Sequence, residues 1–270
     1  LSKSDESNFC LVGIKNISVE FAQMLEKEKP IVAFGPSDPP LEYLMNLIAI
    51  VRDTNCAVTK QILDYEQSET NNWNPTKVES NEDLNALLAQ KLQVNNCIEI
   101  QGPPGTGKTY RMAALSAELL RQGKSVLVTA LTNQALIELV KKKDLKDFLD
   151  AHKITKTSLT VDESKELPKL QPNPKNLCNA APGYLSLATF YLSSAWAKDA
   201  IEIPFDYVIM DEASQALYPM IAASMKLGRK IIWIGDQNQL PPIVLTGKDV
   251  INRYDWGAIV KGFNKIGRAH

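Results

Sequence analysis

The stretch from Gly102 to Thr109 has the residue types and the spacing of a loop that binds polyphosphate. It reads GPPGTGKT and lies between an apolar run at residues 97–101 and a helical pattern that starts at Tyr110. Glycine permits left-handed dihedrals, so successive N–H groups can point at a phosphate, and the helix that follows adds its positive N-terminal end. Lys108 would supply a charge for the β- and γ-phosphates, and Thr109 a hydroxyl ligand for Mg²⁺.

An acid pair, Asp211 and Glu212, directly follows a second apolar run at residues 205–210. Carboxylates at the end of such a strand lie at the edge of the sheet where ligands bind in open α/β folds. Asp211 is the second predicted Mg²⁺ ligand, and Glu212 would orient and deprotonate the attacking water, which favours hydrolysis over transfer to another acceptor. An acid pair alone also occurs as a helix cap, and its combination with the glycine-rich stretch favours the catalytic interpretation.

A third polar segment, GDQNQLPP at residues 235–242, follows another apolar run. Gln239 is placed to contact the γ-phosphate, although the same segment alone could begin a helix. A guanine-reading [NT]KxD segment does not occur in the sequence, which favours ATP over GTP. The predicted catalytic residues are Lys108, Glu212 and Gln239. The predicted nucleotide-binding residues are Gly102, Pro103, Pro104, Gly105, Thr106, Gly107, Lys108, Thr109, Tyr110 and Asp236.

Five short apolar runs must position these residues, and they alternate with helical patterns from about residue 81. Their continuous apolarity is typical of parallel strands that are buried on both faces. A helix is predicted over residues 110–122, with its apolar residues on one face. The pattern predicts an α/β fold with a doubly wound, mostly parallel sheet and a ligand site at the carboxyl ends of the strands. The runs lie at residues 97–101, 125–131, 184–189, 207–210 and 231–234.

The composition, with 44% hydrophobic and 23% charged residues, is that of an ordinary soluble globular protein. The 30 basic and 31 acidic residues balance, so nucleic-acid binding would need a local basic surface. The four cysteines form no CxxC pair, which argues against a zinc module or a disulfide scaffold. With no signal-peptide core and no apolar stretch long enough to span a bilayer, we expect an intracellular protein, cytoplasmic or nuclear, without a membrane partner.

Two parts of the chain are predicted from these patterns. Residues 1–75 form an accessory N-terminal segment in which no chemistry is visible, with a helix predicted over residues 41–52. Residues 76–270 form the domain that carries the motifs, with a polar insertion at about residues 141–180. The basic run at the start of this insertion, residues 141–143, favours a solvated helix face over a nucleic-acid contact.

The three motifs, in their order along the chain, resemble motifs I, II and III of the superfamily 1 helicases. The forms DEASQA at residues 211–216 and GDQNQLPP at residues 235–242 are similar to the branch that contains the up-frameshift RNA helicase of nonsense-mediated decay and the nuclease-helicases of Okazaki-fragment processing. The resemblance covers about residues 81–245. It implies the first RecA-like motor domain of a P-loop NTPase, with ATP and Mg²⁺ as ligands.

The same resemblance implies contacts to single-stranded DNA or RNA. Thr132 and Asn133 match the family's strand-contacting motif Ia, and Thr189 lies where another such motif is expected; all three also suit turns at strand ends. The family's adenine-reading glutamine is not at its usual place, where Asn85 stands instead, and Gln90 is the nearest glutamine.

The family's later motifs supply arginines from a second RecA-like domain, and they are not found in this sequence. Because an arginine finger contributes about 10³ to 10⁵ in rate, we expect the isolated chain to bind Mg-ATP and to hydrolyse it weakly. The alternative is a nucleotide-dependent switch or scaffold that binds a protein partner without translocating.

Overall fold

The computed structural model describes residues 2–3, 10–11, 18–28, 41–53, 76–79, 83–103, 105–173, 178–236, 238, 249 and 252. The chain divides into two compact units, Leu1–Asp38 and Pro39–His270. In the first unit, β1 (Ser2–Lys3) and β2 (Cys10–Leu11) pair antiparallel, and α1 spans Val19–Glu28. Among the residues that the structure describes, no helix combines the length and the apolarity needed to cross a membrane.

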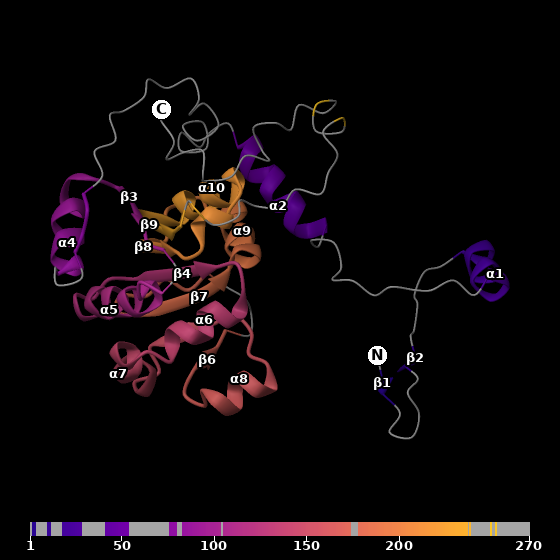
Figure 1. Cartoon of the computed structure of the whole chain (residues 1–270), viewed down its shortest axis with the longest axis horizontal. Helices are drawn as coiled ribbons and strands as arrows, with labels where there is room; N and C mark the ends of the chain where they lie inside the picture. The colour runs from indigo at the N-terminus through magenta and orange to yellow at the C-terminus, as the bar shows by residue number, and fades with distance from the viewer. Residues whose placement is uncertain are drawn as a thin grey trace. The chain divides into compact units, whose positions relative to one another are not determined.

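A parallel sheet is the centre of the second unit (Figure 1). Among the described residues it has seven strands, and every pair of neighbours runs parallel. In spatial order the strands are β3 (Cys97–Gln101), β9 (Gly228–Gly235), β8 (Phe205–Met210), β4 (Val126–Ala130), β7 (Leu185–Thr189), β5 (Ile154–Lys156) and β6 (Gln171–Pro172). The five predicted strands are all present, and the insertion adds β5 and β6 at one edge.

Helices cover both faces of this sheet (Figure 1), which explains why its strands are apolar throughout. The helices α4 (Leu84–Val94), α5 (Lys108–Arg121) and α6 (Asn133–Val140) pack with one set of strand side chains in one core cluster. The helices α2 (Leu41–Arg52), α9 (Phe190–Asp199) and α10 (Tyr218–Leu227) pack with the other set. The doubly wound α/β fold predicted from the sequence is confirmed.

Helix α2 lies against α9 and α10 and belongs to the second unit. The Tyr191 hydroxyl donates a hydrogen bond to the Glu42 carboxylate at 2.8 Å, and the Lys226 ammonium pairs with Asp53 at 2.6 Å. The sequence places its domain boundary near residue 75, after this helix, whereas the boundary between the compact units falls at residue 38. Helix α2 therefore packs with α9 and α10 on the same face of the sheet.

The insertion is built from short elements: a 3-10 turn at Lys143–Leu145, α7 (Lys146–Asp150), β5, α8 (Val161–Glu166) and β6. Lys156 of β5 is buried, because its ammonium donates to the Ser158 carbonyl oxygen at 2.6 Å and to Glu163 at 3.2 Å. A buried lysine costs free energy unless such partners are present. Because β5 contains this lysine, it is not a continuous apolar run, and it was therefore not predicted as a strand of the sheet.

Candidate nucleotide-binding site

Three loops meet at one edge of the sheet because the strands before them are neighbours. In the order β3, β9, β8, Gln101 lies opposite Gly235, and Met210 lies opposite Trp233. The carboxyl ends of parallel strands share one edge, so the glycine-rich stretch, the segment after Gly235 and the acid pair all begin there. The sequence predicted that the glycine-rich stretch, the acid pair and the segment of Gln239 would meet at one edge of the sheet. The strand order explains why the three segments begin at the same edge.

The glycine-rich stretch forms a tight loop before α5. Gly105 and Gly107 have left-handed φ angles of 81° and 79°, which glycine adopts without a steric penalty. A Cβ atom at Gly102 would lie 2.9 Å from Thr106 Oγ1, so the loop closes where only glycine fits. The Thr106 hydroxyl in turn donates to the Pro103 carbonyl oxygen at 2.8 Å. Pro104 lies outside the described residues.

Lys108 and the acid pair are electrostatic neighbours. The Lys108 ammonium donates to the carbonyl oxygens of Gly102 and, at 3.3 Å, of Pro103. Burial raises the pKa of Asp211, while the Glu212 backbone N–H and the charge of Lys108 act to lower it. Burial and the Asp211 charge raise the pKa of Glu212, and Lys108 again opposes the rise.

Glu212 occupies a sharp bend after β8. Its φ angle of 53° is left-handed, which is uncommon for a residue with a Cβ atom and costs about 1 to 3 kcal/mol. Its backbone N–H donates to Asp211 Oδ1 at 2.9 Å, and a 3-10 turn over Ala213–Gln215 follows. Such strain concentrates at functional sites, because the surrounding structure must hold it in place.

The residues present fit a nucleotide triphosphate with Mg²⁺. The glycine-rich loop is open at Gly105 and Gly107, where an added Cβ atom would meet no other atom within 4 Å, and the Lys108 ammonium lies at the backbone of the same loop. The buried Asp211 carboxylate and the half-buried Thr109 hydroxyl supply the hard oxygen ligands that Mg²⁺ prefers.

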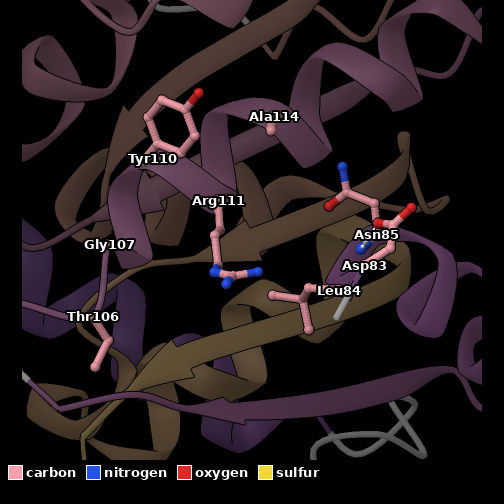
Figure 2. Close-up of a pocket in the computed structure, with 8 residues that line it drawn as sticks. All are labelled: Asp83, Leu84, Asn85, Thr106, Gly107, Tyr110, Arg111 and Ala114. Carbon is pink, nitrogen blue, oxygen red and sulfur yellow. Dashed lines mark hydrogen bonds between the residues drawn. The ribbon is translucent and has the colours of Figure 1, made fainter. Parts of the chain in front are cut away.

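A cavity of about 450 Å³ lies beside the loop, between the start of α4 and the start of α5 (Figure 2). The Asp83 side chain caps α4 by accepting from the backbone N–H groups of Asn85 and Ala86. Tyr110, which lines the cavity, is 45% exposed, and the Lys143 ammonium lies 5.6 Å from the centre of its ring. The cavity is lined by Asp83, Leu84, Asn85, Thr106, Gly107, Tyr110, Arg111 and Ala114.

Four of these lining residues were not predicted from the sequence: Asp83, Leu84, Arg111 and Ala114. Arg111 and Ala114 follow Gly107 at helical spacings of four and seven, so they lie on the helix face that begins at the loop. This helical spacing could have predicted that Arg111 and Ala114 lie beside the phosphate loop.

The candidate strand-contacting residues stand farther along the same edge, after β4 and β7, which neighbour β8. Thr132 caps α6 by accepting from the Ala135 backbone N–H at 3.2 Å, and Asn133 is the exposed first residue of that helix. Thr189 precedes α9, and its side chain makes no capping hydrogen bond. Asp236 is buried and accepts from the Asn238 backbone N–H at 3.0 Å, whereas Gln239 lies outside the described residues.

A family model described as an AAA domain matches residues 79–169 and 187–247, which is more than half of the chain and includes all three motifs. The chain belongs to this family, in the up-frameshift-like branch of the superfamily 1 helicases. Its second unit therefore contains a helicase-like motor domain.

Several of the curated proteins that the chain resembles are named as helicases. It is 30% identical over 162 residues to the DNA replication ATP-dependent helicase/nuclease DNA2 of Saccharomyces cerevisiae, covering 54% of this chain and 10% of that protein. It is 30% identical over 185 residues to the regulator of nonsense transcripts 1 homolog of Drosophila melanogaster, covering 55% and 16%. It is 25% identical over 246 residues to the helicase/nuclease JHS1 of Arabidopsis thaliana, covering 83% and 18%. The chain thus spans less than a fifth of the length of each of these three relatives.

Proposed function

We propose that the chain is the motor domain of an ATP-dependent helicase or translocase, which binds Mg-ATP and single-stranded nucleic acid. The observation that carries this proposal is the meeting of Lys108, Asp211 and Glu212 at one edge of a parallel sheet, beside a glycine-lined loop. Relatives named as ATP-dependent helicases support it.

In this proposal, each residue of the site has one task in hydrolysis. Backbone N–H groups of the loop and the Lys108 ammonium hold the β- and γ-phosphates. Asp211 and Thr109 would hold Mg²⁺, which neutralises charge that develops on the phosphate oxygens. Glu212, on its strained bend, accepts the proton of the attacking water. Gln239 would contact the γ-phosphate.

The cavity between α4 and α5 is suited to the nucleobase, because it opens directly beside the phosphate loop (Figure 2). The Tyr110 ring offers an aromatic face for stacking. The Asn85 amide offers both a donor and an acceptor, which is the pairing that adenine N6 and N7 require. Asn85 would then take the place of the family's adenine-reading glutamine.

Single-stranded nucleic acid would bind farther along the same edge, at the ends of β4 and β7. Thr132, Asn133 and Thr189 follow strands that neighbour β8, so a bound strand there would lie beside the acid pair. Hydrolysis at full rate would need arginines from a second RecA-like domain, and closure of two such domains over the strand would give stepping.

The test is the ATPase activity of the whole protein that contains this chain, with and without single-stranded DNA and RNA. We expect strand-stimulated hydrolysis that is absent in a Lys108→Ala variant. A nucleotide-dependent scaffold would instead bind Mg-ATP at low salt without responding to either strand. That outcome would support the scaffold function and contradict the motor function. A protein that binds no nucleotide at all would contradict both functions.

A further inference from the structure

Gly235, the last residue of β9, is in contact with all three loops of the site. Its carbonyl oxygen accepts a hydrogen bond from the Gly102 backbone N–H, at the start of the phosphate loop, at 3.0 Å. Its Cα faces the segment of the acid pair, since a Cβ atom there would lie 2.9 Å from the Ser214 backbone nitrogen. Its own chain continues into Asp236 and the segment after β9. One glycine is therefore the junction between the three motifs.

Ser214 is the second half of this junction. It is fully buried, with 1% of its surface exposed, and its hydroxyl oxygen lies 3.4 Å from the Asp236 backbone nitrogen, which donates to it. It also belongs to the same turn as Glu212, because the Gln215 backbone N–H donates to the Glu212 carbonyl oxygen at 2.8 Å. A displacement of Ser214 is thus transmitted to the backbone of Glu212.

We propose that Ser214 and Gly235 are positioning residues for hydrolysis. Their contact joins the turn that carries Glu212 to the segment after β9 and to the phosphate loop, so that the three loops move as one body. The contact leaves no space for a side chain at position 235, and a buried serine hydroxyl fixes the register of the two segments. This inference rests on the proposed function and adds to it the element that couples the three motifs.

The first experiment compares two glycines of the same strand. Gly235→Ala brings a Cβ atom against the Ser214 backbone. Gly228→Ala, at the opposite end of β9, brings one to 2.6 Å from Val208 Cγ2, away from the site. Both variants should lose thermal stability, but only Gly235→Ala should lose kcat for Mg-ATP hydrolysis, by about 100-fold for a displacement of about 1 Å. Its Kd for Mg-ATP, measured by titration, should stay within about threefold, which is under 1 kcal/mol.

The milder variant Ser214→Ala removes only the hydroxyl, so it tests the same inference if Gly235→Ala does not fold. We expect kcat to fall about 3- to 10-fold, the effect of one lost hydrogen bond, with the Kd unchanged. In a Glu212→Gln background the same substitution should have no further effect on the residual single-turnover rate, because Ser214 acts through Glu212.

The inference is overturned if Gly228→Ala lowers kcat as much as Gly235→Ala, or if Ser214→Ala lowers the residual rate equally in both backgrounds. Either result would mean a general effect of stability. All assays use the whole protein with oligothymidylate or oligouridylate. Failure of the proposed function would appear differently, as a wild-type protein that does not hydrolyse ATP under these conditions.

Discussion

The ammonium of Lys108 donates a hydrogen bond to the carbonyl oxygen of Gly102, the first residue of its own loop. The loop therefore holds the charge directly over its backbone, and the same charge acts on the carboxyl groups of Asp211 and Glu212. A phosphate oxygen arriving there would meet a cation that the loop already holds in place, which strengthens electrostatic binding.

Replacing Lys108 by alanine should weaken Mg-ATP binding at least about 100-fold, since charge-assisted hydrogen bonds in such sites contribute roughly 1.5 to 3 kcal/mol each. Titration with a fluorescent ATP analogue measures this. Lys91→Ala, which removes an exposed lysine of α4, is the matched control and should bind normally. If the wild type, Lys108→Ala and Lys91→Ala bound Mg-ATP equally, Lys108 would not be part of the nucleotide-binding site.

Replacing Glu212 by glutamine should separate binding from hydrolysis. The amide keeps the shape of the side chain but cannot accept a proton, so kcat should fall by about 10² to 10⁴ while the Kd for Mg-ATP is retained. Glu202→Gln, an exposed acid before the same strand, controls for the loss of one negative charge. Normal turnover by Glu212→Gln would refute the role of Glu212 as the base.

The nucleobase cavity can be tested at Tyr110. Tyr110→Ala should weaken ATP binding about tenfold or more, because one base stacked on an aromatic ring contributes about 1 to 3 kcal/mol. Binding of inorganic tripolyphosphate, which has no base, should not change. Tyr110→Phe keeps the ring and should bind ATP like the wild type. A parallel loss of ATP and tripolyphosphate binding would show a damaged phosphate loop instead.

The strand contacts can be tested at Asn133 and Thr189. Asn133→Ala and Thr189→Ala together should weaken single-strand binding about 3- to 30-fold, at a contribution of roughly 1 kcal/mol for each lost hydrogen bond, and leave ATP binding unchanged. Thr160→Ala is the control for a lost polar side chain, because it removes the capping box of α8 in the insertion and should cost only stability. If the double variant bound single-stranded nucleic acid as tightly as the wild type, neither Asn133 nor Thr189 would contact the strand.

The central strands could be predicted because their apolar runs are continuous. The exact residues at which the strands begin and end could not be predicted in the same way. The prediction for β9 began at Ile231, whereas the strand begins at Gly228 and includes two charged residues. Lys230 is tolerated there because its ammonium donates to the Leu92 carbonyl oxygen at 2.6 Å and to Asn96 Oδ1 at 3.0 Å. Those partners come from the end of α4 and the turn after it, more than 130 positions away, so local sequence carries no sign of them.

The site was predictable to the same extent and for the same reason. The glycine stretch and the acid pair carry their chemistry in adjacent residues, so spacing alone identifies them. The cavity joins α4 to α5, and the Ser214–Gly235 junction joins β8 to β9; both depend on which strands become neighbours. No local pattern encodes that order.

Glu99 should make the stability of the motor domain depend on pH. It lies within β3 opposite Trp233, and its Oε2 atom is buried without a hydrogen-bond partner among the described residues. Burial raises the pKa of this carboxyl to about 7. In the unfolded chain the group has an ordinary pKa of about 4.3, so between about pH 4.5 and 7 the folded state binds more protons than the unfolded state. The free energy of unfolding must then fall as pH rises through this window and stay low above it.

Glu99→Gln removes this dependence, because an amide of the same shape stays neutral at every pH. At pH 8 we expect the variant to unfold with a free energy about 2 kcal/mol higher than the wild type, and at pH 4 the two should be equal. Urea unfolding at a series of pH values measures the difference. Glu118→Gln, whose carboxylate pairs with Arg121 at the surface, is the control and should show little change. A Glu99→Gln variant that is equally less stable at pH 4 and pH 8 would mean that the carboxylate has a polar partner in the folded protein.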